Sequence, residues 1–100
     1  MIATGCTVRN TFTIPYKRDE IAALYVTYCQ KEKCVVEKTL DDCTFREGSF
    51  FVDLSQEDTL KLCPCARVQV QYKGRFTDGV VFKSKIKHTT TDGLLNRDVI

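Results

Sequence analysis

Residues 60–72, LKLCPCARVQVQY, decide the fold class, because apolar and polar side chains alternate along most of this stretch. The apolar face of the resulting strand would comprise Leu60, Leu62, Ala66, Val68, Val70 and Tyr72. The polar face would comprise Lys61, Arg67, Gln69 and Gln71. Alternation with a period of two is typical of an antiparallel sheet with one buried and one solvated face. Pro64 has no N–H to donate, so we expect an irregularity or a strand start near Cys65.

Period-two patterns recur elsewhere in the chain. Further strands are predicted over residues 8–14, 21–28, 34–38, 50–54 and 80–87. The run from Ile21 to Tyr28 is almost continuously apolar, which predicts a strand buried on both faces. Asp78-Gly79 predicts a hairpin turn, whereas no convincing helix is predicted, although Ser55 with Asp58 could cap one helical turn. Six or seven strands separated by regular turns indicate an all-β protein, an antiparallel β-sandwich.

Length and composition favour one small domain. The chain has 100 residues, of which 43% are hydrophobic, so one modest core is expected. We expect a single sandwich over residues 1–88 and a linker or C-terminal tail over residues 89–100. The formal net charge of +2 gives no reason to expect a nucleic-acid partner. No apolar run is long enough to predict a membrane span.

Six cysteines are the strongest compositional signal: Cys6, Cys29, Cys34, Cys43, Cys63 and Cys65. An even number in a short chain predicts disulfides, hence an extracellular protein or a cell- or virion-surface protein whose signal peptide has been removed. A Cys63–Cys65 bridge would strain the backbone, so each should reach another partner. Two simple schemes place Cys29 or Cys34 opposite that pair and join Cys6 or Cys43 to the remainder. Alternatively, Cys29, Cys34, Cys63 and Cys65 could gather around zinc, but the repeated two-residue knuckle of structural zinc sites is missing. We therefore expect no metal and no cofactor.

The sequence predicts a protein that is not an enzyme. His88 is the only histidine, and nothing marks one of the cysteines as its nucleophilic partner. Adjacent carboxylates such as Asp41-Asp42 and Glu57-Asp58 would point to opposite faces of a strand and are better explained as turn formers. No phosphate-binding loop or nucleophile elbow is present.

Two surfaces are candidates for binding. The first is a hairpin tip over residues 72–79, whose predicted protein-binding residues are Tyr72, Lys73, Arg75 and Phe76. Phe76 could equally fold back onto the core. The second is a basic patch on one strand face, formed by Lys83, Lys85 and Lys87. Such lysines protect an edge strand from aggregation or bind a glycosaminoglycan or an acidic partner.

Residues 43–83 resemble the last three strands of a fibronectin type III module. Residues 51–55 resemble the strand before the corner, residues 66–72 the next strand, and residues 79–82 the last. The added cysteines are similar to those of N-terminal cytokine-receptor modules. Residues 33–36, 46–47 and 51–53 also resemble the immunoglobulin-like third domain of class II membrane-fusion glycoproteins. Both resemblances imply a disulfide-stapled sandwich of the immunoglobulin or fibronectin type III kind that binds protein through its end loops.

A third resemblance is to cystine-knot growth factors, because Cys63-Pro64-Cys65 follows two closely spaced cysteines. That resemblance implies the bridges Cys6–Cys43, Cys29–Cys63 and Cys34–Cys65, and a secreted ligand. The chain nevertheless continues for 35 residues after Cys65, with two predicted strands. The expectation is a non-enzymatic extracellular protein-binding module, either a receptor ectodomain or a surface-glycoprotein domain, with the fusion-glycoprotein domain and the cystine-knot ligand as alternatives.

Overall fold

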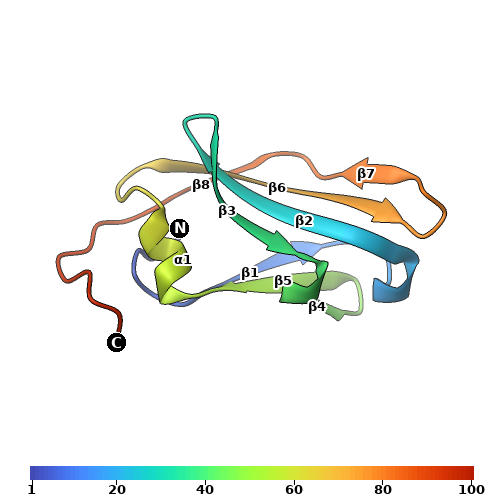
Figure 1. Cartoon of the computed structure of the whole chain (residues 1–100), viewed down its shortest axis with the longest axis horizontal. Coiled ribbons are helices and arrows are strands. Elements are labelled where there is room, and N and C mark those ends of the chain that lie inside the picture. Colours follow the sequence, from blue (N-terminus) through green and yellow to red (C-terminus); the bar gives the residue numbers. More distant parts are fainter.

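The computed structural model describes all 100 residues as two antiparallel β-sheets and one short α-helix (Figure 1). The strands are β1 (Val8–Thr13), β2 (Ile21–Gln30), β3 (Lys33–Thr39), β4 (Cys43–Arg46), β5 (Ser49–Leu54), β6 (Arg67–Phe76), β7 (Val81–Lys83) and β8 (Lys87–Thr90). The helix α1 spans Gln56–Lys61, and single 3-10 turns span Arg18–Glu20 and Leu40–Asp42. The prediction of an all-β protein built of antiparallel sheets is confirmed. The expectation of six or seven strands and no convincing helix was wrong, because the chain forms eight strands and the helix α1.

The smaller sheet has the strand order β1-β5-β4. Its register places Phe12 opposite Phe50, and Asn10 opposite Val52. Phe50, Val52 and Leu54 are buried, whereas Asp53 is exposed. The predicted alternation over residues 50–54 therefore gives this sheet one buried face.

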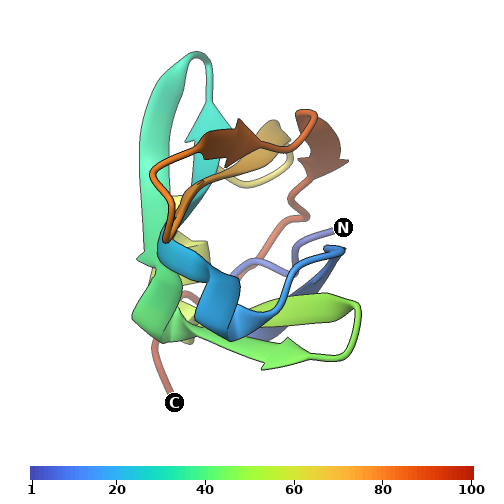
Figure 2. The same cartoon turned by 90° about the vertical axis from the view of Figure 1, so that its right-hand side faces the viewer.

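The larger sheet has the order β3-β2-β6-β7, and β8 pairs with β6 beside β7. The two ten-residue strands β2 and β6 form its centre. Leu24, Val26 and Tyr28 face the core from β2. The run from Ile21 to Tyr28 was predicted to be buried on both faces, and this was wrong, because Tyr25 is 48% exposed. No further layer covers the outer face of this sheet (Figure 2).

An aromatic cluster fills the space between the sheets. The Phe50 ring stacks on Phe12 at 5.1 Å and on Phe45 at 5.2 Å between centroids. Tyr72, on the opposite sheet, meets Phe50 edge-on at 5.4 Å. Such aromatic pairs contribute about 0.5–1.5 kcal/mol each beyond the burial of their area. Figure 2 shows the two layers end-on, with β4 and β5 below the larger sheet.

A hydrogen bond also crosses between the sheets. Tyr28, fully buried on β2, donates its hydroxyl proton to Oδ1 of Asn10 on β1 over 2.7 Å. Asn10 interrupts the apolar face of residues 8–14, and this bond gives the amide a partner inside the sandwich. Burial raises the pKa of the Tyr28 phenol, so the hydroxyl remains a donor.

The helix α1 begins at the cap formed by Ser55. The Ser55 hydroxyl accepts from the Asp58 amide over 3.1 Å, and Asp58 accepts from the Ser55 amide over 2.9 Å. Leu60 lies within this helix and Leu62 directly after it, so the strand pattern of residues 60–62 does not form a strand. The capping box favours a helix here despite the apolar–polar alternation of residues 60–62. The strand β6 begins only at Arg67.

An ion pair fixes α1 against the larger sheet. Lys38 Nζ lies 2.7 Å from Asp58 Oδ2, and both side chains are largely buried, at 20% and 12% exposure. Loss of solvent alone would raise the pKa of Asp58. Hydrogen bonds from Lys38 and Ser55 outweigh that effect, so the pKa lies below its ordinary value.

The C-terminal segment joins the sheet further along than expected. The strand β8 extends to Thr90, and Thr91 is 4% exposed. The Thr91 hydroxyl donates to the Cys63 carbonyl over 2.6 Å, and Ile2 forms a parallel bridge with Thr91. Regular structure therefore continues past residue 88, where we expected a linker to begin.

We predict that Asp58→Asn lowers the free energy of unfolding at neutral pH by about 2–4 kcal/mol, because it leaves Lys38 without its buried partner and weakens the cap. Since the pKa of Asp58 is lowered on folding, this contribution is complete above the ordinary value of 3.8 and disappears as the pH falls below it. Urea unfolding from neutral pH to the acid limb should show the two proteins converging at low pH. Asp19→Asn, a change at an exposed carboxylate outside any ion pair, is the control. An equal loss for both variants would contradict the role of the ion pair.

We predict that Tyr28→Phe costs about 1–2 kcal/mol of stability, since the Asn10 amide oxygen loses its donor in a poorly solvated site. The outward-facing Tyr25→Phe should change stability by less than about 0.5 kcal/mol. Chemical denaturation of both variants measures the difference, and equal stabilities would contradict the importance of the inter-sheet bond.

Candidate functional site

The outer face of the larger sheet carries the candidate site. Alternation along β6 turns Val68 and Val70 into the core and leaves Lys73 and Arg75 exposed. Tyr25 is the one large apolar side chain that β2 leaves strongly exposed. The site is therefore a sheet surface on which one exposed aromatic ring lies beside exposed cations.

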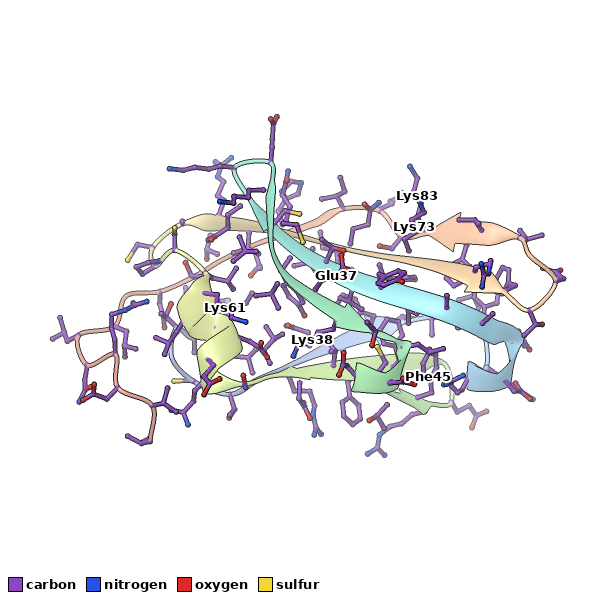
Figure 3. All side chains as sticks on the ribbon, in the orientation of Figure 1. Glu37, Lys38, Phe45, Lys61, Lys73 and Lys83 are labelled. Atoms are coloured by element: carbon purple, nitrogen blue, oxygen red, sulfur yellow. The ribbon has the colours of Figure 1, made fainter.

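The register brings three of these side chains into one row across neighbouring strands. Tyr25 on β2 is opposite Lys73 on β6, and Lys73 is opposite Lys83 on β7. Directly opposite residues have Cβ atoms about 4.5–5.5 Å apart, so the two lysines repel each other. Figure 3 shows Lys73 and Lys83 on these adjacent strands. Glu37 belongs to β3, which pairs with the edge of β2 opposite to β6. We call Tyr25, Lys73 and Lys83 the cationic row.

No carboxylate of the chain neutralises the cationic row. Only two ion pairs occur within 4.0 Å, Arg9–Asp53 and Lys38–Asp58, and both lie elsewhere. Glu37, on β3, forms no ion pair with the row, and its carboxylate accepts from the Thr27 hydroxyl over 3.4 Å. Arg75, next along the outer face of β6, is also exposed and lies opposite Val81. The row therefore presents unpaired positive charge next to an exposed phenol ring.

The predicted hairpin tip has a different structure from the one expected. Residues 72–76 belong to β6, and the turn comprises only residues 77–80. Tyr72 packs on the core, and Phe76 stacks on Phe82 at 4.4 Å between centroids, so both rings point inward. Lys73 and Arg75 point outward. The four residues predicted to bind protein are thus divided between the two faces of one strand.

The predicted basic patch is also divided. Lys73 comes three residues after Val70 on β6. Their partners are Lys83 and Lys87, and Lys87 comes four residues after Lys83, so the partner segment contains one extra residue. Ser84 occupies this irregularity, where its hydroxyl accepts from the Tyr72 amide over 3.1 Å. As a result Lys83 faces outward, while Nζ of Lys87 lies 5.3 Å from the centre of the core-facing Phe12 ring. The expectation that Lys83, Lys85 and Lys87 share one face was therefore wrong, because an extra residue reverses the alternation.

A groove lies at the end of the β2–β3 hairpin, on the same side of the sheet as the cationic row. It encloses about 850 Å³ and contains three of the six cysteines together with the only histidine. Its lining includes Cys29, Cys34, Cys63, Lys61, Arg67 and His88. The register places Cys34 opposite Cys29, Cys29 opposite Gln69, and Gln69 opposite His88.

The six cysteines are free thiols in this structure, and they are dispersed. Cys6, Cys63 and Cys65 are exposed. Cys43 is half-buried, and loss of solvent, with the nearby Asp42 carboxylate, raises the pKa of its thiol to about 11. No group of three or more His, Cys, Asp or Glu side chains lies close enough together to hold a metal ion. Only Cys29 and Cys34 are directly opposite each other, a pairing that neither the simple schemes nor the cystine-knot pattern includes.

Comparison of the chain with protein-family models, curated proteins and solved structures finds no match. None of its helices combines the length and the apolar character needed to span a bilayer. The assignment of a function to the candidate site therefore rests on the geometry of its residues alone.

We predict that Lys83→Glu raises the free energy of unfolding by about 0.5 kcal/mol, because it replaces a repulsive cross-strand pair with an attractive one. Urea unfolding at low ionic strength should show the gain, and added salt should remove it. Lys85→Glu makes the same charge change in the irregular segment after β7 and is the matched control. A gain of the same size in both variants would show that net charge alone, rather than the Lys73–Lys83 contact, is responsible.

Proposed function

We propose that this chain is a non-enzymatic extracellular module that binds an acidic protein surface through the outer face of its larger sheet. The observation that carries the proposal is the unneutralised cationic row of Tyr25, Lys73 and Lys83. Like charges placed directly opposite each other cost stability. A partner that supplies carboxylates would relieve that cost, and Tyr25 would supply buried contact area of the kind enriched in binding hot spots.

The strand order supports an immunoglobulin-like sandwich. The order β1-β5-β4 corresponds to strands B, E and D, and β3-β2-β6-β7 corresponds to C′, C, F and G. The parallel bridge between Ile2 and Thr91 occupies the place of a short first strand beside the last strand. The surface that we propose binds the acidic partner is the outer face of the sheet formed by β3, β2, β6 and β7.

An extracellular location is proposed from the cysteines. Cys29 and Cys34 are cross-strand partners directly after a register shift between Tyr28 and Cys29, where Val35 is the extra residue on β3. Opposite residues of an antiparallel pair have Cα atoms about 4.5–5.5 Å apart, which lies within the range of a disulfide. Disulfides of this kind persist in oxidising compartments. A receptor ectodomain and a surface-glycoprotein domain, including the third domain of a fusion glycoprotein, are both compatible with this proposal.

The test is a binding screen with the purified chain, multimerised on a carrier, against a panel of extracellular protein domains. Any partner that binds through the cationic row should lose at least about tenfold in affinity when Lys73 and Lys83 are both changed to Glu. Lys17→Glu with Lys31→Glu carries the same net charge change at two exposed lysines outside the row, and should leave the affinity unchanged.

A glycosaminoglycan is the competing partner for the same cations. Heparin chromatography separates the two possibilities, because a polyanion binder should elute only at high salt and lose retention in the double Glu variant. Tyr25→Ser is the third arm, since it should weaken a protein complex but leave heparin retention unaltered. Protein partners that bind the double Glu variant as well as the parent chain would overturn the proposal.

A further inference from the structure

The β2–β3 hairpin brings two thiols together beside a cationic groove. Cys29 and Cys34 are cross-strand partners, adjacent to the pair Gln30 and Lys33 that closes the turn. The turn itself consists of Lys31 and Glu32, both in the left-handed region, with φ of 51° and 64°. Non-glycine residues rarely adopt that conformation, so the surrounding pairing must hold this turn in place.

The inner side of the same hairpin is fixed to the rest of the fold. Gln30 is 7% exposed, and its side chain accepts from the Cys63 amide over 2.7 Å and donates to the Cys63 carbonyl over 3.1 Å. These bonds hold the hairpin end against the segment between α1 and β6. Cys29, the residue before Gln30 on β2, points the opposite way, into the groove on the outer face.

The groove is strongly positive. Four cations line it, with only one carboxylate, Glu32. The cations come from the hairpin and from two other parts of the chain: Lys31, Lys33, Lys61 and Arg67. A reagent that enters the groove therefore meets the thiols of Cys29, Cys34 and Cys63 and a positive field that favours anions. Of these three, only Cys29 and Cys34 are cross-strand partners.

We propose that Cys29 and Cys34 form a reversible disulfide by thiol–disulfide exchange with an anionic small-molecule disulfide of the glutathione class, which this groove receives. One thiolate of the pair attacks a sulfur of the small disulfide, which breaks its S–S bond and releases one thiol. The second thiolate then attacks the mixed disulfide at the protein sulfur and releases the other thiol. The pair loses two electrons and two protons, and the small disulfide is reduced to two thiols.

The environment of Cys34 is consistent with a pair that favours the oxidised form. Partial loss of solvent, followed by the neighbouring Cys29 and Glu37, raises the pKa of the Cys34 thiol. The reduced pair therefore gains no stabilisation from a Cys34 thiolate at neutral pH. This inference does not depend on the proposed binding surface, but it shares the Cys29–Cys34 pair with the proposed extracellular location.

The reduced chain, equilibrated in mixtures of reduced and oxidised glutathione and then acid-quenched and alkylated, tests the pairing. Trypsin cleaves after Lys31 and Lys33, so a Cys29–Cys34 bridge joins two separate peptides in a non-reducing map. As the mixture becomes more oxidising, we expect the linked peptide pair to appear in a single two-electron transition. In Cys29→Ser, Cys34 has no partner thiol, and we expect it to carry one glutathione. Cys43→Ser, which removes a thiol remote from the pair, should leave the step unchanged. A map that joins Cys34 to Cys63 or Cys65, or two thiols still free under conditions that oxidise the unfolded chain, would overturn the proposal.

A second experiment tests the groove. Lys61→Ser with Arg67→Ser removes two groove cations from outside the hairpin, and should slow oxidation by glutathione disulfide by about tenfold. Oxidation by the uncharged hydroxyethyl disulfide should proceed at the parent rate. Arg75→Ser with Lys83→Ser removes the same charge from the same sheet face outside the groove, and should slow neither reagent. Equal slowing of both reagents by the groove variant would overturn the role assigned to its charge.

Discussion

The sandwich depends on the ring of Phe50, which contacts aromatic side chains from both sheets. Phe12 and Phe45 flank it on its own sheet, and Tyr72 meets it from the other. This packing determines which side of each strand is buried, and the strict alternation of β-structure then determines which side chains remain outside. The cationic row is therefore a consequence of the core, because Tyr72 cannot turn inward unless Lys73 turns outward.

Polar contacts add positional specificity to this apolar packing. The Tyr28–Asn10 bond joins the two sheets at a defined register, and the Lys38–Asp58 pair fixes α1 to the edge strand β3. Each would be unfavourable if one partner were missing, since the remaining group would stay poorly solvated. Neither contact involves the outer face of the larger sheet, where the cationic row lies.

Local patterns predicted the strands, but not the pairings that create the site. Residues 50–54 and 67–72 behave as their alternation predicts because each strand has one buried face. The orientation of Lys87 depends on one extra residue near Ser84, which no local pattern signals. The Cys29–Cys34 pairing depends on a two-residue turn at Lys31 and Glu32, which lacks the glycine or asparagine by which such turns are normally found. Tyr25 could have been placed outside only by knowing that β2 pairs with β6.

The pairings that close the sandwich join segments far apart in the chain, and such pairings form more slowly than local ones. The strand β1 pairs with β5, β2 with β6, and Ile2 with Thr91. Each of these contacts requires closure of a long loop before it yields any stabilisation, so such topologies fold slowly, roughly in milliseconds to seconds. The β2–β3 hairpin needs only a two-residue turn and can form long before β6 docks. The early hairpin therefore presents its unpaired β2 edge until the sixth strand is made, and this interval is when the chain is most exposed to pairing with another copy of itself.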